Sequence, residues 1–368
     1  MSEYQYYEFQ TVDRPLTDQE QEAVGKLSSH IEVSPTRAVV TYSFGGGFRH
    51  DCKEVLAKYF DAMLYMANWG SKQLLFRFPS GLIDLDSIMP YCLEDWVTSW
   101  AIGGHVVLDI HFDEEGDMDW VEGEGVLSPL LRLRDDILHG DYRALYLAWL
   151  RAIVLDDPEV AMADVEPPVP AGLKNPNAAL SRFVQVFGVD RHLAAAATAS
   201  SPPLQAKPQD DLRQAIARLP RETCDDLLFR LAQGEAHLSL ALNRVLQPTT
   251  PLSPVEATPR RAVAQLFAEA QELRGRARTR QAEEAERKRL RDLQVLAQNE
   301  DRSWEEVEAL IKRSQAQPYE QAVELLAKLQ ELAAFQGSQA AFSERIGQLR
   351  TRYKGRPSLM ERLRKAGL

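Results

Sequence analysis

The chain has 368 residues, of which 45% are hydrophobic and 26% are charged. This composition is typical of a folded globular protein and excludes a chain that is disordered throughout, and the length predicts two or three domains. The longest apolar runs fall far short of the ~20 residues that a membrane helix needs, and the polar, acidic start of the chain is unlike a signal peptide. The three cysteines lie far apart, which argues against a disulfide framework. We therefore expect a cytoplasmic protein.

The charge is unevenly distributed along the chain. Residues 1–250 hold 21 Lys+Arg and 37 Asp+Glu, a net charge of −16, whereas residues 251–368 hold 22 and 17, a net charge of +5. An acidic body followed by a mildly basic tail predicts different partners for the two halves. The acidic body is expected to repel nucleic acid, and the tail to attract it weakly.

Residues 1–165 have the pattern of an α+β head domain. Aromatic enrichment predicts a strand at 3–12, a capping box at Thr17–Glu20 begins a helix to 28, and alternation predicts a strand at 37–44. A helix is expected at 52–66, strands at 72–78 and 105–112, and a hairpin turn at 113–117 with a return strand at 118–121. Helices at 126–138 and 141–155 follow. We expect about five or six strands in a mixed or antiparallel sheet, with helices packed on one face.

The rest of the chain reads as helical modules separated by proline-rich spacers. A linker is expected at 166–175, then a small helical domain at 176–247, with helices at 178–187, 190–198, 212–219, 223–233 and 235–246. A second linker covers 248–258. Residues 259–300 predict one long charged helix, because large apolar residues are missing from its middle. Residues 301–368 predict a helical module that begins with a capping box at Ser303–Glu306, contains an antiparallel hairpin of 318–335 and 338–353, and ends in a helix from 358.

Several strings resemble a known family. The opening Ser2–Gln10, then Asp13–Thr17, Ala67–Gly70 and Glu166–Pro170, are similar to a family of bacterial proteins labelled hypothetical. The resemblance covers most of the chain and implies a bacterial protein. It implies no activity, cofactor or catalytic residue.

A glycine run is the first candidate binding site. Gly45, Gly46 and Gly47 stand between a predicted strand and a predicted helix, where backbone amides can bind a phosphate. The run lacks both the Walker sequence and the dinucleotide-binding spacing, so a flexible connection is the simpler interpretation.

Three other clusters have weaker patterns. The acidic turn at 113–119 could hold a hard cation but lacks the EF-hand spacing, which favours a solvated turn. His50 and Cys52 lie at a helix start, where a thiolate would be stabilised, although Cys52 also fits as a small first-turn residue. His105 and His111 fall on one strand face with Asp109, a set that could bind a metal, although zinc spacing is missing.

Aromatic and basic clusters raise the question of nucleic acid. Tyr4, Tyr6, Tyr7 and Trp69 could form a stacking platform, but the acidic surroundings favour core packing. The strongest candidate for nucleic-acid binding is the set of four arginines within seven residues, Arg274, Arg276, Arg278 and Arg280. The glutamates that follow them can pair with Arg287 and Arg289, so a charged solvated helix is the simpler interpretation.

The sequence as a whole favours an interaction protein over an enzyme. It contains several modules and no recognised catalytic motif, so we expect no cofactor and no metal, and an adaptor in which head and tail engage different protein partners, with self-association as a further option. The alternative is a nucleic-acid-associated factor that uses the four arginines. A second alternative is an enzyme of unrecognised type that uses the loop from Gly45 to Cys52.

Overall fold

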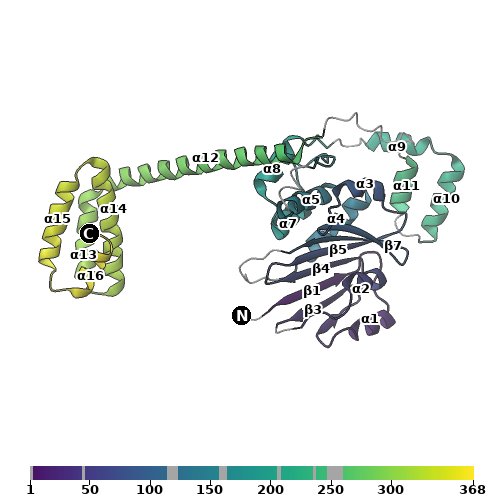
Figure 1. Cartoon of the computed structure of the whole chain (residues 1–368), viewed down its shortest axis with the longest axis horizontal. Helices are drawn as coiled ribbons and strands as arrows, with labels where there is room; N and C mark the ends of the chain where they lie inside the picture. Colours follow the sequence, from purple (N-terminus) through teal and green to yellow (C-terminus); the bar gives the residue numbers. More distant parts are fainter. Residues whose placement is uncertain are drawn as a thin grey trace. The chain divides into compact units, whose positions relative to one another are not determined.

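The computed structural model describes residues 3–43, 46–113, 123–156, 164–204, 209–234, 238–246 and 260–368 (Figure 1). The chain divides into two compact units, Met1–Arg274 and Gly275–Leu368. Helices within the described ranges are all too short or too polar to cross a membrane. The finer division expected from the proline spacers stays a prediction.

The first unit is built on an antiparallel sheet in the order β2-β3-β1-β4-β5-β7-β6. Every neighbouring pair is antiparallel, and β1 lies inside the sheet, with Phe9 opposite Ala38 of β3 and Met63 of β4. The predicted α+β class is therefore confirmed, and of the mixed and antiparallel sheets that the sequence left open, the sheet is antiparallel. The strands are β1 (Gln5–Gln10), β2 (Ile31–Val33), β3 (Arg37–Tyr42), β4 (Ala62–Ala67), β5 (Lys72–Pro79), β6 (Val97–Ile102) and β7 (His105–Phe112).

Strand β4 corrects one prediction. The helix expected at 52–66 ends at Tyr59, as α2 (Cys52–Tyr59), and the apolar run that follows is a strand. Leu64 and Met66 pack into the core on one face of the sheet, and Met63 into the core on the other. A strand buried on both faces shows no apolar–polar alternation, so periodicity alone does not distinguish it from a buried helix.

Helices cover both faces of the sheet, which differs from the expected single layer. The larger core joins one face to α4 (Leu127–Leu138), α5 (Arg143–Leu155), α7 (Ala178–Phe187) and α8 (Arg191–Ala199). The smaller core joins the other face to α2 and to α1 (Asp18–Gly25), which begins at the predicted Thr17–Glu20 capping box. Two short helical turns, α3 (Leu85–Ile88) and Met89–Tyr91, lie before β6. The predicted return strand at 118–121 lies outside the described residues.

The long helix α12 (Val263–Gln298) begins in the core of the first unit. Val263, Leu266 and Ala270 are buried there. The residues before the helix are held by a buried clamp, in which the Arg261 guanidinium lies 2.8 Å from the Glu166 carboxylate and Tyr146 donates its hydroxyl proton to the same carboxylate. The predicted long charged helix is thus confirmed.

The second unit is a helical bundle with its own core. Its helices are α13 (Glu300–Lys312), α14 (Ala316–Gln336), α15 (Gln339–Arg352) and α16 (Pro357–Lys365). The predicted hairpin is confirmed, with Gly337 at φ +71° ending α14. The capping box predicted at Ser303 is wrong, because α13 begins three residues earlier and the Ser303 hydroxyl donates to the Asn299 carbonyl within the helix, at 3.0 Å.

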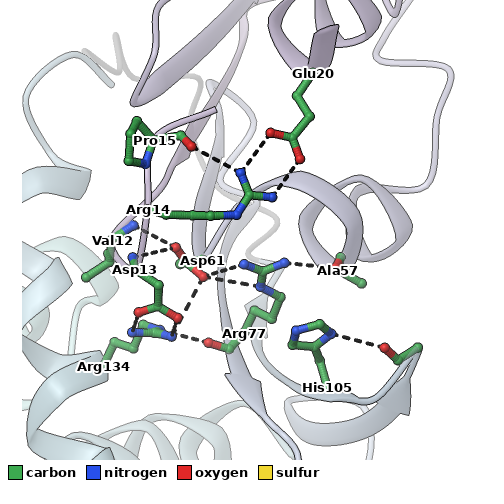
Figure 2. A network of polar contacts seen from close by, with 11 residues as sticks. Val12, Asp13, Arg14, Pro15, Glu20, Ala57, Asp61, Arg77, His105 and Arg134 are labelled. Atoms are coloured by element: carbon green, nitrogen blue, oxygen red, sulfur yellow. Dashed lines mark hydrogen bonds and ion pairs between the residues drawn. The ribbon is translucent and has the colours of Figure 1, made fainter. Parts of the chain in front are cut away.

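A buried ionic network fixes one end of the sheet (Figure 2). The Asp61 carboxylate, at the start of β4, accepts backbone N–H bonds from Val12 and Asp13 at 2.7 and 2.9 Å, and pairs with Arg77 of β5 at 2.6 Å. Arg134 of α4 is 2% exposed, binds Asp13 through both carboxylate oxygens, and donates to the Arg77 carbonyl at 2.7 Å. The network joins β1, β4, β5 and α4.

The ionisation of Asp61 is part of this network. Burial alone would raise the pKa of Asp61, but the two backbone N–H donors and the charges of Arg134 and Arg77 outweigh burial and lower it. Both oxygens of the carboxylate are engaged, so the group has a structural role.

Replacing Asp61 by asparagine is expected to lower the free energy of unfolding by about 3–5 kcal/mol, because Arg77 stays buried without its carboxylate and Arg134 keeps only that of Asp13. Since the folded pKa of Asp61 lies below its unfolded value of about 3.9, this contribution is complete above that pH and is lost as the pH falls through the folded pKa. Urea unfolding at neutral and at acid pH measures both effects.

The matched control is Asp18→Asn, at an exposed position in the first turn of α1. It should change the stability by no more than about 0.5 kcal/mol. Equal effects of the two substitutions at neutral pH would contradict a stabilising role for the network.

Candidate functional sites

A polar hollow lies at the β3 side of the first unit. Its volume is about 670 Å³, and we call it the basic hollow because Lys26, His30 and Arg49 line it together with Thr41, Tyr42 and Gly47. Lys26 and His30 come from the turn between α1 and β2, and Arg49 from the loop between β3 and α2. Of the predicted glycine run, Gly46 and Gly47 line this hollow, and Gly45 lies outside the described residues.

The glycine loop is shaped by its neighbours. Gly46 has φ +99°, a conformation that favours glycine, and Gln5 donates to its carbonyl at 2.6 Å. Asp51 caps α2, where its carboxylate accepts from the Lys53 amide at 2.7 Å. An aspartate at that helix start opposes an anion there, so the alternative of a phosphate bound at the helix start is unfavourable. The predicted phosphate loop itself stays a prediction.

Cys52 is in a setting unsuited to a nucleophile. Burial, followed by the negative charges of Asp51 and Asp109, raises the pKa of the Cys52 thiol to about 12. The thiol therefore stays protonated at neutral pH. His50 is exposed and lies with its ring 5.5 Å from that of Phe48.

The three residues of β7 that were weighed as a possible metal site have separate partners. His105 contacts the Gly103 carbonyl through Nδ1 at 3.2 Å, and His111 lies 3.3 Å from Asp113. Asp109 is buried and paired with Lys53 at 2.8 Å. Groups of three or more His, Cys, Asp or Glu side chains suited to a metal do not occur among the described residues. Within the predicted acidic turn, residues 114–119 lie outside them.

The tyrosines of β1 belong to the interior of the sheet. Tyr6 and Tyr7 are buried, which agrees with core packing. Tyr6 donates its hydroxyl proton to the buried Glu8 carboxylate at 2.7 Å, and Arg37 pairs with that carboxylate at 2.6 Å. Burial and the Glu8 charge raise the pKa of Tyr6, so this closed cluster offers no proton donor near neutral pH.

The four predicted arginines do not form one patch. At 100° per residue, Arg274 and Arg278 share one side of α12, and Arg276 and Arg280 lie on nearly the opposite side. Arg274 is also paired with Asp190, at 2.6 Å. Nucleic-acid binding by these residues stays a prediction.

An apolar groove lies among α9 (Gln209–Ala217), α10 (Arg221–Ala232) and α11 (Leu238–Leu246). We call it the leucine groove; its volume is about 360 Å³. Leu228, Phe229 and Leu231 of these helices are about 60% exposed, at 59%, 62% and 60%. The sequence analysis did not predict this exposed apolar surface. A signal for it was present, because the adjacent apolar residues at 227–229 make more than one side of α10 apolar. The groove is lined by Ile216, Leu219, Cys224, Leu227, Leu228, Leu231, Leu238 and Leu242.

Comparisons of the chain with protein-family models, with curated proteins and with solved structures give no match. Function must therefore be argued from the sites themselves.

The thiol of Cys52 is expected to react slowly in the folded protein. In a variant that keeps only Cys52, with Cys92→Ser and Cys224→Ser, alkylation by iodoacetamide near pH 8 should be at least about tenfold slower when the protein is folded than in urea, because the raised pKa leaves little thiolate. Mass spectrometry of timed samples measures the rate. Equal rates would contradict the raised pKa and reopen Cys52 as a nucleophile.

Proposed function

We propose that this protein is an adaptor that binds protein partners without catalysing a reaction, and that the leucine groove receives an amphipathic helix of one partner. The observation that carries the proposal is the exposure of Leu228 and Leu231, which line one continuous apolar groove. Contiguous apolar surface of this kind is characteristic of interaction sites.

The three groove helices bury little of their own apolar surface. Leu227 is the buried residue of α10, at 8% exposure, and within the described parts of α9–α11 no side chain belongs to the cores of the sheet or of the second unit. A partner that covers the groove would gain about 25 cal/mol for each Å² of apolar surface removed from water.

The arrangement of the groove fits a helix as its occupant. Leu228 and Leu231 of α10 are three residues apart, and Leu238 and Leu242 of α11 are four apart, so each wall presents one row of side chains. Rows of this spacing receive the apolar side of an amphipathic helix. The charges beside the groove are largely paired within α10, by Arg221 with Asp225 at 3.0 Å, and by Arg230 with Asp226 at 3.5 Å. Binding should therefore depend little on salt.

Features of the second unit favour the proposal that it binds a separate partner. It has its own core, and a hollow of about 360 Å³ lies between α14 and α15, lined by Ala327, Ala334 and Phe342 among others. Phe335 of α14 is 54% exposed. An adaptor needs separate surfaces on independently packed bodies, and the two compact units with their own cores support this part of the proposal. A place in the cytoplasm is part of the proposal.

The occupant of the groove can be identified by site-specific photo-crosslinking. A benzoyl-phenylalanine placed at Leu228, which lines the groove, in the full-length protein in cells of its source, should crosslink to a helical segment of another protein that is apolar on one side. Leu228 is 59% exposed, and the exposure-matched control is Val295 of α12, which is 60% exposed. Adducts only with the chain's own sequence, or no adduct specific to position 228, would overturn the proposed occupant.

The substitution Leu228→Glu tests the energetics. It should weaken binding of the identified partner at least about tenfold, because a charge would enter the apolar lining of the groove. The stability of the free protein should change little, since the Leu228 side chain is mostly exposed. Val295→Glu should leave the affinity unchanged. An equal affinity of Leu228→Glu and the unmodified protein would contradict docking in the groove.

A second candidate function is binding of nucleic acid through α12. Helical geometry places Arg276, Arg280, Arg287 and Arg291 within about 60° of one another, along about 22 Å of the helix. All of these side chains are exposed. Glu283 and Glu284 flank this side of the helix and weaken its positive field.

Alanine at these four arginines should reduce the affinity of the full-length protein for a labelled DNA duplex. It should also make the salt dependence shallower, by about one in the log–log slope for each phosphate that the variant no longer binds. Fluorescence anisotropy at several salt concentrations measures this. The control has the same charge change at four other exposed arginines of the second unit. Identical salt slopes for the two variants would rule out a contact by this side of α12. The control positions are Arg302, Arg313, Arg350 and Arg364.

A further inference from the structure

The basic hollow stands out by its charge. It is lined by Lys26, His30 and Arg49, and none of its lining residues is acidic, although residues 1–250 carry a net charge of −16. A concave site lined by one sign of charge concentrates the electrostatic field and attracts ligands of the opposite sign. The hollow should therefore attract anions, although the net negative charge of residues 1–250 repels them elsewhere on the surface.

The cationic groups are available to a ligand. Arg49 is exposed, and within the described residues it forms no ion pair with an acidic side chain. Lys26 lies 2.6 Å from Glu22, but both side chains are 71% exposed, and an exposed pair of this kind contributes little and exchanges readily. An arginine fork suits phosphate oxygens, which it can bind in a bidentate manner.

The hollow also has groups that suit the rest of a small molecule. Ser28 shares a hydrogen bond with the Tyr42 hydroxyl at 3.0 Å, and the rings of His30 and Tyr42 are 5.6 Å apart. The Gln5 side-chain amide donates to the Gly46 carbonyl next to the hollow, so this backbone oxygen already has a hydrogen-bond partner. A volume of about 670 Å³ lies within the usual range for small-molecule sites.

We infer that the basic hollow binds a small phosphomonoester, with Arg49 and Lys26 on the phosphate and the Tyr42 side of the hollow against the remainder of the ligand. A carboxylate ligand would meet the same cations, but the hollow offers two separate cationic groups and several hydroxyls, which match the three oxygens and the double charge of a phosphate. This site is independent of the leucine groove.

The experiment is calorimetric titration of the full-length protein with adenosine 5′-monophosphate and ribose 5-phosphate, each compared with its parent nucleoside or sugar. Saturable binding of a phosphorylated probe, at least about tenfold tighter than its parent compound and displaced by inorganic phosphate, is the expected result. If neither phosphorylated probe binds saturably, or if each binds no better than its parent, the inference is wrong.

Matched variants assign the binding to the hollow. Arg49→Ala and Lys26→Ala should each weaken the phosphorylated probe, Arg49→Ala by at least about tenfold, because each removes a cation from the phosphate. Both side chains are exposed, so the fold should persist, and thermal unfolding checks this. Arg182→Ala, an equal loss of charge on α7, is the control. Equal affinities of Arg49→Ala and Arg182→Ala would overturn the assignment.

Discussion

The fold of the first unit depends on the burial of Arg134. An arginine cannot be neutralised in a protein, so a guanidinium that is 2% exposed must find its counter-charge inside. Arg134 binds Asp13 at 2.8 Å and lies 3.7 Å from Asp61, which is 1% exposed and itself held by Arg77. Because these residues come from α4, the end of β1 and two further strands, the helix cannot shift on the sheet without separating buried charges. Apolar contacts alone would allow α4 to pack on the sheet in several shifted positions, and the ionic network favours one of these positions.

This constraint also bears on where function can lie. The most deeply buried carboxylates of the first unit, those of Asp61, Glu8 and Glu166, are each held by an arginine and by further hydrogen bonds. Carboxylates engaged in this way stabilise the fold, and their oxygens are already occupied by protein partners rather than open to a ligand. The surfaces left for function are those that the cores do not use. In the described part of the chain these include the basic hollow, the leucine groove and the exposed middle of α12.

Local signals in the sequence were sufficient for much of the fold. The capping box at Thr17–Glu20, the stripe of α5 and the polar middle of α12 each predicted an element that the structure contains. Signals failed where tertiary packing decides. Strand β4 is apolar on both sides because helices cover both faces, and the helix that begins at Glu300 runs through the Ser303 capping pattern. The Asp61 network could not be predicted, because its members at positions 13, 61, 77 and 134 meet only in the folded chain.

The candidate sites show the same division between local and tertiary information. The glycine run lies beside the basic hollow, but the local pattern that suggested a phosphate site is not what makes this region basic. Asp51 occupies the helix start after the run, whereas the positive charge near the loop comes from Lys26 and Arg49, which are 23 residues apart in the sequence. The leucine groove likewise exists only when α9, α10 and α11 stand together. The two proposed interactions also differ physically. The proposed contact in the groove rests on apolar burial and should tolerate salt, whereas the proposed charge-driven binding in the hollow should weaken as salt increases. The salt dependence of each interaction therefore separates the two without reference to the ligand.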